Sequence, residues 1–272
     1  MNGMTPQQPI VDGSTRLYGI IGDPIEQVKS PLVFNPRFKA AGRNAVLVPL
    51  HVRPDRLEET VRGLKALGNI DGIVVTVPYK VRAMSLVDEV LPTGVAVGAI
   101  NAMRPGPDGR WTGDMFDGRG LVRGLAEEGI SVAGRRVMLI GAGGAGSAVA
   151  VAFAEAGAAT ITIHDVDAAK ASALVGRAMK AFPACKVEVG APAAAGRDII
   201  VNATPIGMAP GDGLPAEIGA LDPAQLVIDV IAKPEVTPLL AAARQQGCRT
   251  IGGKTMLAGQ VAALEAFFGI GA

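Results

Sequence analysis

The stretch Val137-Met-Leu-Ile-Gly-Ala-Gly-Gly-Ala-Gly-Ser-Ala-Val-Ala-Val-Ala-Phe153 decides the fold of this chain. Its apolar start predicts a buried strand, and the alanine-rich run after the glycines predicts a helix. The glycines between them match the G-x-G-x-x-G pattern of a pyrophosphate-binding turn. Such a turn presents backbone N–H groups and the positive end of a helix dipole to a diphosphate. The residues expected to bind a dinucleotide here are Gly141, Gly143, Gly144, Ala145 and Gly146.

An acidic residue follows at the distance that a dinucleotide fold uses. The segment Thr160-Ile-Thr-Ile-His-Asp165 reads as a second strand that ends in an acid, about twenty residues past the last glycine. A carboxylate there accepts hydrogen bonds from the adenosine ribose and repels a 2′-phosphate. Asp165 therefore predicts a site that prefers NAD to NADP. Asp167, two residues further on, is the second candidate for binding the ribose. The plainer interpretation is a glycine-tolerant turn followed by a surface aspartate.

The overall composition describes a globular protein and excludes several partner classes. The 272 residues are 49% hydrophobic and 19% charged, which is typical of a buried parallel sheet. A net charge of +1 without long basic runs argues against nucleic acid. Cys185 and Cys248 lack metal-ligand spacing and suit a reducing compartment. Residues 1–14 show no signal pattern and no apolar run reaches about 18 residues, so we expect a cytoplasmic protein without membrane contacts.

The patterns before and after the glycine turn predict two α/β domains. Strands are expected at 17–22, 45–52 and 72–78, a helix opens at Ser30, and further helices cover 54–67 and 79–87. This arrangement predicts a mostly parallel substrate domain in residues 1–116, ahead of a Rossmann-type dinucleotide domain in residues 117–252. The last segment, 253–272, is expected to be a helix that completes the first domain. The active site would then lie in the cleft between the domains.

One lysine stands out in the first domain. The segment Val75-Thr-Val-Pro-Tyr-Lys80 places it at the start of a predicted helix, directly after a strand. A cation is disfavoured at a helix N-terminus, so such a lysine needs a compensating acid or has a lowered pKa. Either condition suits general acid–base chemistry. A solvated surface lysine is the alternative interpretation.

With these residues the chain resembles the shikimate dehydrogenase family along nearly its whole length. The matching motifs, in chain order, are Gly22-Asp-Pro24, Lys29-Ser-Pro31, Val75-Thr-Val-Pro-Tyr-Lys80, Gly98-Ala-Ile-Asn101, Gly113-Asp114 with Asp117-Gly118, the glycine turn, Asn202-Ala-Thr204 and Gln260. The resemblance implies reversible hydride transfer between a nicotinamide and a secondary alcohol on a carboxylated six-membered ring. It also implies that Lys80 and Asp117 are the catalytic pair, in which the lysine takes the hydroxyl proton and the carboxylate orients it.

The remaining site residues follow from the same resemblance. Asn101 and Thr76 would bind substrate hydroxyls, Ser30 the carboxylate end, and Gln260 a further hydroxyl. On the cofactor side the resemblance adds Asn202 and Thr204. Met208, in a loop after a sheet strand, is a candidate for nicotinamide contact or an ordinary loop residue. No metal is expected, and the family resemblance allows a homodimer as well as a monomer.

Four departures from the family pattern concern the substrate carboxylate and the cofactor. The usual Ser-Lys-Ser reads Val28-Lys-Ser30, and a usual tyrosine aligns with Ala232. Two polar residues before the aspartate are Met115 and Phe116, and a basic stretch that binds the NADP phosphate reads His164-Asp-Val166. These changes predict a divergent, NAD-preferring member acting on shikimate, quinate or a related compound such as an amino-shikimate.

Two other functional classes stay open at this point. The first is a non-catalytic sensor of NAD, against which the retained Lys80 and Asp117 argue. The second is another two-domain dehydrogenase, such as one acting on methylene-tetrahydrofolate, against which Asn101 and Gln260 argue.

Overall fold

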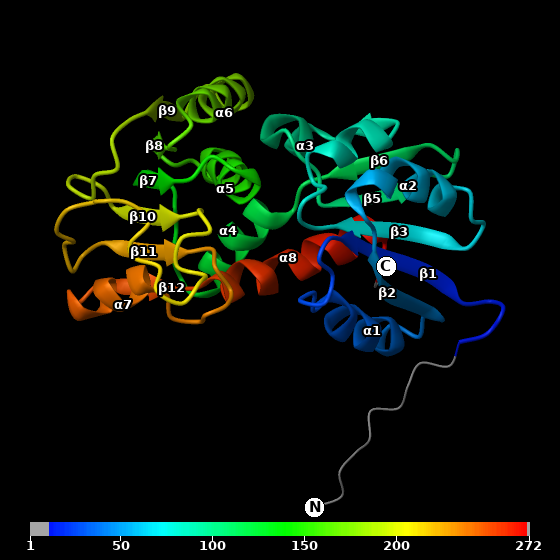
Figure 1. The fold of residues 1–272 in the computed structure, drawn as a ribbon. Coiled ribbons are helices and arrows are strands. Elements are labelled where there is room, and N and C mark those ends of the chain that lie inside the picture. Colours follow the sequence, from blue (N-terminus) through cyan, green and yellow to red (C-terminus); the bar gives the residue numbers. More distant parts are fainter. Residues whose placement is uncertain (1–10, 271–272) are drawn as a thin grey trace, which may run out of the picture. The chain divides into compact units, whose positions relative to one another are not determined.

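The computed structural model describes residues 11–270, which form two compact units with one six-stranded sheet each (Figure 1). The first unit contains the chain up to Leu91, Ala99–Asp114 and the residues from Leu264 on. The second unit contains Pro92–Gly98 and Met115–Ala263. Residues 1–10 and 271–272 lie outside the described residues. They include most of the start in which no signal pattern was found and the end of the predicted final segment. The predicted domain limits at residues 116 and 252 stay predictions.

The sheet of the second unit is entirely parallel, with the order β9-β8-β7-β10-β11-β12. Its strands are β7 (Arg136–Ile140), β8 (Thr160–His164), β9 (Lys186–Val189), β10 (Ile199–Asn202), β11 (Leu226–Asp229) and β12 (Arg249–Ile251). Its longer helices are α4 (Asp117–Glu127), α5 (Gly144–Glu155), α6 (Ala168–Ala181) and α7 (Pro238–Gln245). Counted along the chain, this strand order is 3-2-1-4-5-6, that of a doubly wound dinucleotide fold. The order reverses between β7 and β10, at the carboxyl end of which such folds bind their ligands.

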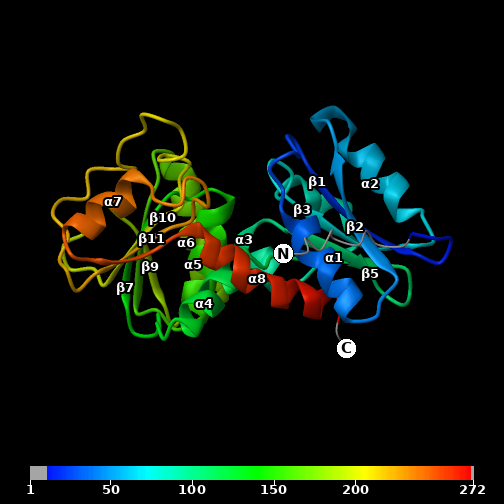
Figure 2. The same ribbon diagram turned by 90° about the horizontal axis from the view of Figure 1, so that it is seen from below.

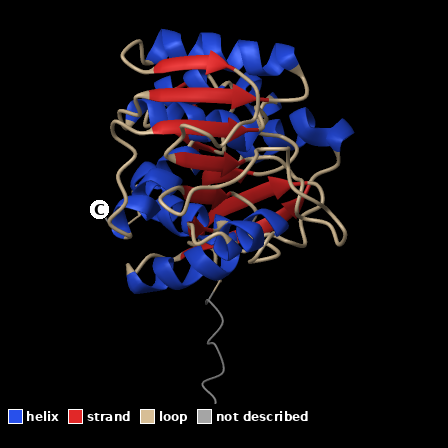
Figure 3. Cartoon of the chain, turned by 90° about the vertical axis from the view of Figure 1, so that its left-hand side faces the viewer, coloured by secondary structure: helices blue, strands red, loops and turns tan. Residues whose placement is uncertain are grey.

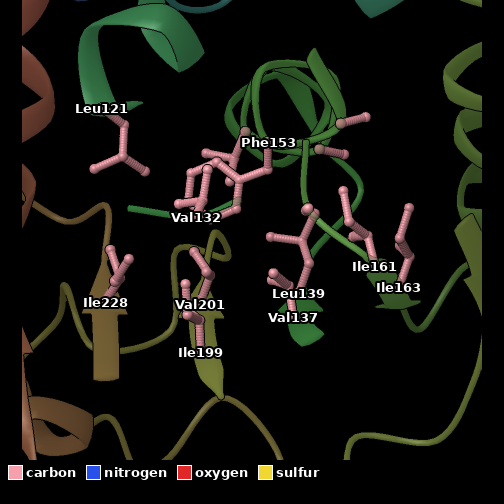
Figure 4. Close-up of a cluster of buried hydrophobic side chains, with 14 of the residues drawn as sticks. Leu121, Val132, Val137, Leu139, Phe153, Ile161, Ile163, Ile199, Val201 and Ile228 are labelled. Carbon is pink, nitrogen blue, oxygen red and sulfur yellow. The ribbon is translucent and has the colours of Figure 1, made fainter. Parts of the chain in front are cut away.

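Alternation along each strand buries both faces of this sheet. Val137 and Leu139 of β7 belong to a cluster with Phe153 of α5, and Figure 4 shows these side chains on the same side of the strands. The intervening residues Met138 and Ile140 belong to a second cluster that includes side chains of α7. A parallel sheet needs this cover on both faces, which explains the near-continuous apolar runs of its strands.

The sheet of the first unit has the order β2-β1-β3-β5-β6-β4. Its strands are β1 (Arg16–Gly22), β2 (Ala45–His51), β3 (Ile70–Val75), β4 (Glu89–Val90), β5 (Ala102–Pro105) and β6 (Trp111–Asp114). The pairs β1–β2, β1–β3 and β4–β6 are parallel, whereas β5 is antiparallel to β3 and to β6. The sheet is therefore mostly parallel, as predicted. The hairpin of β5 and β6 is not among the predicted elements, although Gly106-Pro-Asp-Gly109 is a turn signal between two short strands.

Helices cover both faces of this first sheet, as they do for the sheet of the second unit, which faces the viewer in Figure 3 (helices blue, strands red). On one face, Leu57 and Val61 of α2 (Leu57–Lys65) pack in a cluster with β3 residues such as Ile73. The other face has an aromatic cluster, in which Tyr18 stacks on Phe38 of α1 (Ser30–Ala40) with ring centroids 4.8 Å apart. Phe268, at the end of α8 (Gly253–Phe268), meets Tyr18 edge-on at 5.3 Å. Figure 2 shows this end of α8 (red) beside α1, where Arg37 and Glu265 form an ion pair of 2.9 Å. The end of the last helix thus completes the core of the first unit.

The helix predicted for residues 79–87 begins later in the structure and is of the 3₁₀ type. A turn at Lys80 is followed by the short 3₁₀ helix Arg82–Leu86. The turn after β3 is anchored by Tyr79, a fully buried residue whose hydroxyl donates to the Val52 carbonyl oxygen. This anchor holds the backbone close to the sheet, and after the turn at residues 80–81 only the five residues 82–86 remain before the bend that leads to β4. Lys80 therefore does not lie at an α-helix N-terminus.

Helix α4 packs backbone against backbone on its neighbours within the second unit. A Cβ atom added at Gly118 would lie 1.9 Å from the Ala148 carbonyl oxygen of α5. One added at Gly120 would lie 2.6 Å from the backbone nitrogen of Gln260, and one added at Gly259 would lie 2.0 Å from the Gly120 carbonyl oxygen. These three glycines form what we call the glycine junction: Gly118, Gly120 and Gly259. It leaves no room for a methyl group between the three helices.

Replacing Gly118 by alanine should lower the free energy of unfolding by roughly 2–3 kcal/mol, because the methyl group forces the helices apart. The matched control is Gly176→Ala in α6, where an added Cβ meets nothing within 4 Å. That variant should be neutral or gain roughly 0.5–1 kcal/mol, since alanine favours a helix interior over glycine. Urea unfolding followed by circular dichroism measures both, and equal shifts in the two variants would contradict the packing argument.

No helix among residues 11–270 is both long and apolar enough to cross a membrane. In the same range, no three side chains of histidine, cysteine, aspartate or glutamate lie together in a way that could hold a metal ion.

Candidate active site

Backbone hydrogen bonds bring two predicted substrate residues to one end of the first sheet. The N–H of Thr76, directly after β3, donates to the Ile21 carbonyl oxygen of β1 at 3.0 Å. The N–H of Val75 donates to the Asn101 carbonyl oxygen at 2.7 Å, and the N–H of Asn101 donates to the Asp114 carbonyl oxygen at 2.9 Å. Because β5 is antiparallel to β3, Asn101, directly before the first residue of β5, lies beside the carboxyl end of β3. Open α/β sheets bind ligands at this end.

Lys80 and Ser30 belong to the same end of this sheet. Lys80 follows Thr76 in the turn after β3, it is half-buried, and its carbonyl oxygen accepts from the Ile100 N–H at 2.9 Å. That bond joins the lysine turn to the segment that carries Asn101. Ser30 is the first residue of α1, and its neighbour Lys29 is the N-cap, with no side-chain capping bond. The serine hydroxyl is therefore not used to cap the helix.

In the second unit, Asp117 is the first residue of α4 and only 4% exposed. A carboxylate in the first turn of a helix is stabilised by the free N–H groups and by the helix dipole. Gln260 of α8 lies opposite Gly120 of α4. Gly120 is about one helical turn after Asp117 along α4. The glycine junction thus fixes the helix that carries the predicted catalytic acid against the helix that carries Gln260.

The glycine turn has the geometry that the sequence predicts for a diphosphate site. Gly141 has a φ of +102°, which L side chains rarely adopt, and a Cβ added at Gly146 would lie 1.9 Å from the Gly141 carbonyl oxygen. Gly143 and Gly144 are exposed, and a Cβ added to either meets nothing within 4 Å. The Ser147 N–H donates to Gly143, so the N–H groups of residues 144–146 are left without an acceptor inside α5. This open cradle at a helix N-terminus fits a dinucleotide diphosphate.

The two candidate ribose acids have different hydrogen-bond partners. Asp165 follows β8 and accepts from the Ala142 N–H of the glycine turn at 2.6 Å and from the Asp167 N–H at 2.8 Å. Asp167 is the N-cap of α6 and accepts from the N–H groups of Ala169 and Lys170. These backbone bonds lower the pKa of Asp167, with that from Lys170 the largest cause. Asp165 therefore borders the glycine turn, while Asp167 caps a helix.

Asn202 and Thr204 form a polar network after β10. Asn202 is fully buried, and its side-chain oxygen accepts from both the N–H and the hydroxyl of Thr204 at 3.0 and 2.8 Å. Its amide nitrogen donates to the Ile206 carbonyl oxygen and to the Asp229 carboxylate, each at 3.1 Å. The network holds the loop that carries Met208, whose side chain is 56% exposed.

Two further pairs of residues at these strand ends are not among the predicted site residues. Asp229 accepts from the Thr237 hydroxyl at 2.7 Å and so completes the Asn202 network, and an acid within the apolar run of β11 could have signalled it. The His51 Nε2 and Asp23 Oδ1 atoms lie within hydrogen-bond distance, 2.8 Å apart, at the carboxyl ends of β2 and β1. His51 and Asp23 both lie at the ends of predicted strands, and this position is the sequence feature that could have identified them as site residues.

Burial raises the pKa of the Asp229 carboxyl, against the opposing effect of its hydrogen bonds. A pKa raised in the folded state adds stability at low pH, and this contribution is lost as the pH rises above the unfolded value of about 3.9 and through the folded pKa. Asparagine carries no charge at any pH. The free energy of unfolding of Asp229→Asn, relative to wild type, should therefore increase between about pH 4 and about pH 8. Urea unfolding at both pH values tests this, and a difference that falls with pH would contradict it.

Comparison with known proteins matches both halves of the chain. The shikimate dehydrogenase substrate binding domain matches residues 20–103, and the shikimate / quinate 5-dehydrogenase family matches residues 124–208. The shikimate dehydrogenase (NADP(+)) of Rubrobacter xylanophilus is 39% identical over 270 residues, which cover 96% of this chain and 94% of that protein. The chain belongs to the shikimate dehydrogenase family. It is an NAD(P)-dependent alcohol dehydrogenase of this type.

Solved structures of the shikimate dehydrogenase family and its relatives have the same fold. Shikimate 5-dehydrogenase of Listeria monocytogenes, in complex with shikimate and NAD, has a TM-score of 0.86 at 31% identity, covering 97% of this chain and 94% of that one. Quinate dehydrogenase of Corynebacterium glutamicum, in complex with NAD, has a TM-score of 0.83 at 30% identity and 94% coverage of both chains. The 5-ketofructose reductase of a Gluconobacter strain has a TM-score of 0.83 at 32% identity, covering 94% and 93%. These matches favour neither an NAD sensor nor a folate-type dehydrogenase.

Proposed function

We propose that this enzyme interconverts a secondary hydroxyl and a ketone on shikimate, quinate or a related polyol carboxylate, and that it prefers NAD to NADP. The observation that carries the proposal is the pairing of two features. The Thr76–Lys80 turn and Asn101 share the carboxyl end of the first sheet, and Asp165 borders the glycine turn in the second unit. The first feature supports the chemistry and the second supports the cofactor.

We assign the proton transfer to Lys80 and Asp117. Lys80 takes the proton from the substrate hydroxyl oxygen during oxidation and returns it to the ketone oxygen during reduction. Asp117 orients the ammonium group and stabilises its charged form, for which a carboxylate held at a helix N-terminus is suited. The bound nicotinamide supplies or accepts the hydride. Thr76, Asn101, Ser30 and Gln260 would bind the polar groups of the substrate.

The cofactor would be held by the glycine turn and by the loop after β10. Residues 143–146 would bind the diphosphate, Asp165 the ribose, and Thr204 and Met208 the nicotinamide end. Asn202 would act by fixing the Thr204 loop, because its amide group is already used within that loop.

Charge around Asp165 supports the preference for NAD. The segment 164–170 contains two aspartates and one lysine, Lys170, which lies 3.5 Å from Asp167. A 2′-phosphate would meet this acidic surface without an arginine to bind it. The curated relatives with the highest identity are named as NADP(+) enzymes, whereas two related structures contain NAD. The cofactor preference is thus a proposed difference from those relatives.

A second candidate substrate is a polyhydroxylated ketone without a carboxylate. Val28 replaces one serine of the family's carboxylate-binding pair, and Ala232 replaces a tyrosine, so two polar partners of the carboxylate are absent. The related 5-ketofructose reductase is named for a sugar ketone. A pocket without these partners loses less affinity when the carboxylate is missing.

A substrate panel tests both candidates with the intact enzyme. Shikimate, quinate, amino-shikimate and dihydroxycyclohexane carboxylates are assayed with NAD and with NADP, and 5-ketofructose is assayed with NADH and NADPH. The main proposal expects the highest kcat/KM for a ring carboxylate with NAD. A higher value for 5-ketofructose would favour the second candidate, and a higher value for NADP with any substrate would contradict the cofactor proposal.

A further inference from the structure

The second unit contains a cavity at the amino ends of its strands, the opposite end of the sheet from the glycine turn. Its volume is about 360 Å³, and its charged lining residues are Arg135, Arg136, Arg197, Asp198 and Asp222. A neighbouring hollow of about 200 Å³ shares Arg135 and Asp198 with it and adds Arg249. The volume of the larger cavity is in the range of sites for small metabolites.

Both carboxylates of the cavity already have partners. Asp198 accepts from the Arg136 backbone N–H at 2.7 Å and from its guanidinium at 2.8 and 3.1 Å. The side-chain bond to Arg136 is the largest cause that lowers the pKa of Asp198 to about 2. Asp222 accepts from the Ala224 N–H at 2.9 Å. Asp198 is therefore paired with Arg136, and neither aspartate is hydrogen-bonded to the other two arginines of the cavity.

These two arginines, Arg135 and Arg197, have no side-chain hydrogen bond to any residue in 11–270, and the Nε atom of Arg197 is buried without a partner there. A guanidinium nitrogen that is removed from water without an acceptor costs free energy. The loop that carries Arg197 is held in place by Gln225, a buried residue whose amide donates to the Ala194 and Arg197 carbonyl oxygens at 2.7 and 2.9 Å. The backbone of the unpartnered arginine is thus fixed before any ligand arrives.

We propose that this cavity binds an oxyanion, the phosphate or carboxylate group of a small metabolite, between Arg135 and Arg197. The planar guanidinium fork matches both groups, and the oxygens of a bound oxyanion would supply the acceptor that the Arg197 Nε atom lacks. This binding site lies at the other end of the sheet from the residues proposed for the dinucleotide. Its occupant is therefore expected to bind together with the cofactor.

Isothermal titration of the intact protein with inorganic phosphate and with citrate, in the presence of saturating NAD, tests the proposal. Arg135→Gln and Arg197→Gln should each weaken binding by roughly 10-fold or more, as expected when hydrogen bonds to a charged group are lost. The matched control is Arg123→Gln, which removes one exposed charge from α4 of the same unit, where Arg123 pairs with Glu127. Phosphate binding tighter than citrate would indicate a phosphate ligand, and the reverse a carboxylate.

Arg135 is exposed, so its replacement should leave folding and turnover intact even if Arg197→Gln is unstable. The absence of saturable binding of either anion to wild type would overturn the proposal. An equal loss in Arg123→Gln would overturn it as well, because it would indicate general charge attraction. Neither result would affect the proposed function, since these arginines are not among the residues assigned to it.

Discussion

Replacing Lys80 by alanine should lower kcat by roughly 10²- to 10⁴-fold, the range that a positioned general acid–base group contributes. The loss is expected in kcat because the lysine acts on the oxygen atom whose charge changes during the reaction. Binding of NAD should be unchanged, since the glycine turn and the Asp165 loop belong to the other unit. Steady-state kinetics with the best substrate of the panel and a separate NAD titration measure the two effects.

Two further variants separate proton transfer from simple binding. Lys80→Arg keeps the positive charge, but a guanidinium does not give up its proton, so this variant should stay nearly as inactive as the alanine variant. Lys39→Ala removes an exposed lysine of α1 in the same unit and should keep wild-type kinetics. A raised KM with unchanged kcat in Lys80→Ala would show that the lysine only binds substrate, and the assigned mechanism would then be wrong.

Asp165→Asn should lower the ratio of kcat/KM for NAD over NADP by roughly 10- to 100-fold, the value of a hydrogen bond to a charged group. The variant removes the negative charge that opposes the 2′-phosphate but keeps an oxygen that can accept from the Ala142 N–H. The glycine turn should therefore keep its shape. The change is expected both as weaker use of NAD, whose ribose loses a charged acceptor, and as improved use of NADP.

The control for this experiment is the neighbouring aspartate. Asp167→Asn removes the same charge two residues away, but its carboxylate caps α6. Because asparagine is also a good N-cap, this variant should change neither stability nor the cofactor ratio by much. If Asp167→Asn shifts the ratio and Asp165→Asn does not, the ribose contact belongs to Asp167 instead.

The second unit was the easier half to predict, because local patterns specify it. The glycine turn requires a strand before it and a helix after it, and the structure has β7 and α5 there. Helix α6 (Ala168–Ala181) is likewise specified locally, because Asp167 provides an N-cap directly before the alanine-rich run. In parallel sheets that are buried on both faces, the apolar strand runs are long enough to recognise.

The first unit shows where local patterns are insufficient. The apolar residues of 79–87 fit a helical spacing, but the buried Tyr79 ties the backbone to Val52, a residue distant in sequence. Strands β5 and β6 have only four residues each, and β5 is antiparallel to β3 and to β6 within a sheet whose other pairs are parallel. The polar network of Asp229, Thr237 and Asn202 likewise depends on contacts across neighbouring strands. Such contacts depend on the tertiary structure.

The glycine junction also decides where this enzyme can be changed by laboratory evolution. Positions such as Val28 and Ala232 are half-buried, carry ordinary side chains and can be randomised to explore new substrates. Gly118, Gly120 and Gly259 behave differently, because any side chain there displaces the helices that carry Asp117 and Gln260. A variant library that includes these glycines would lose most of its members to misfolding. One that keeps them constant concentrates diversity where new specificity can arise.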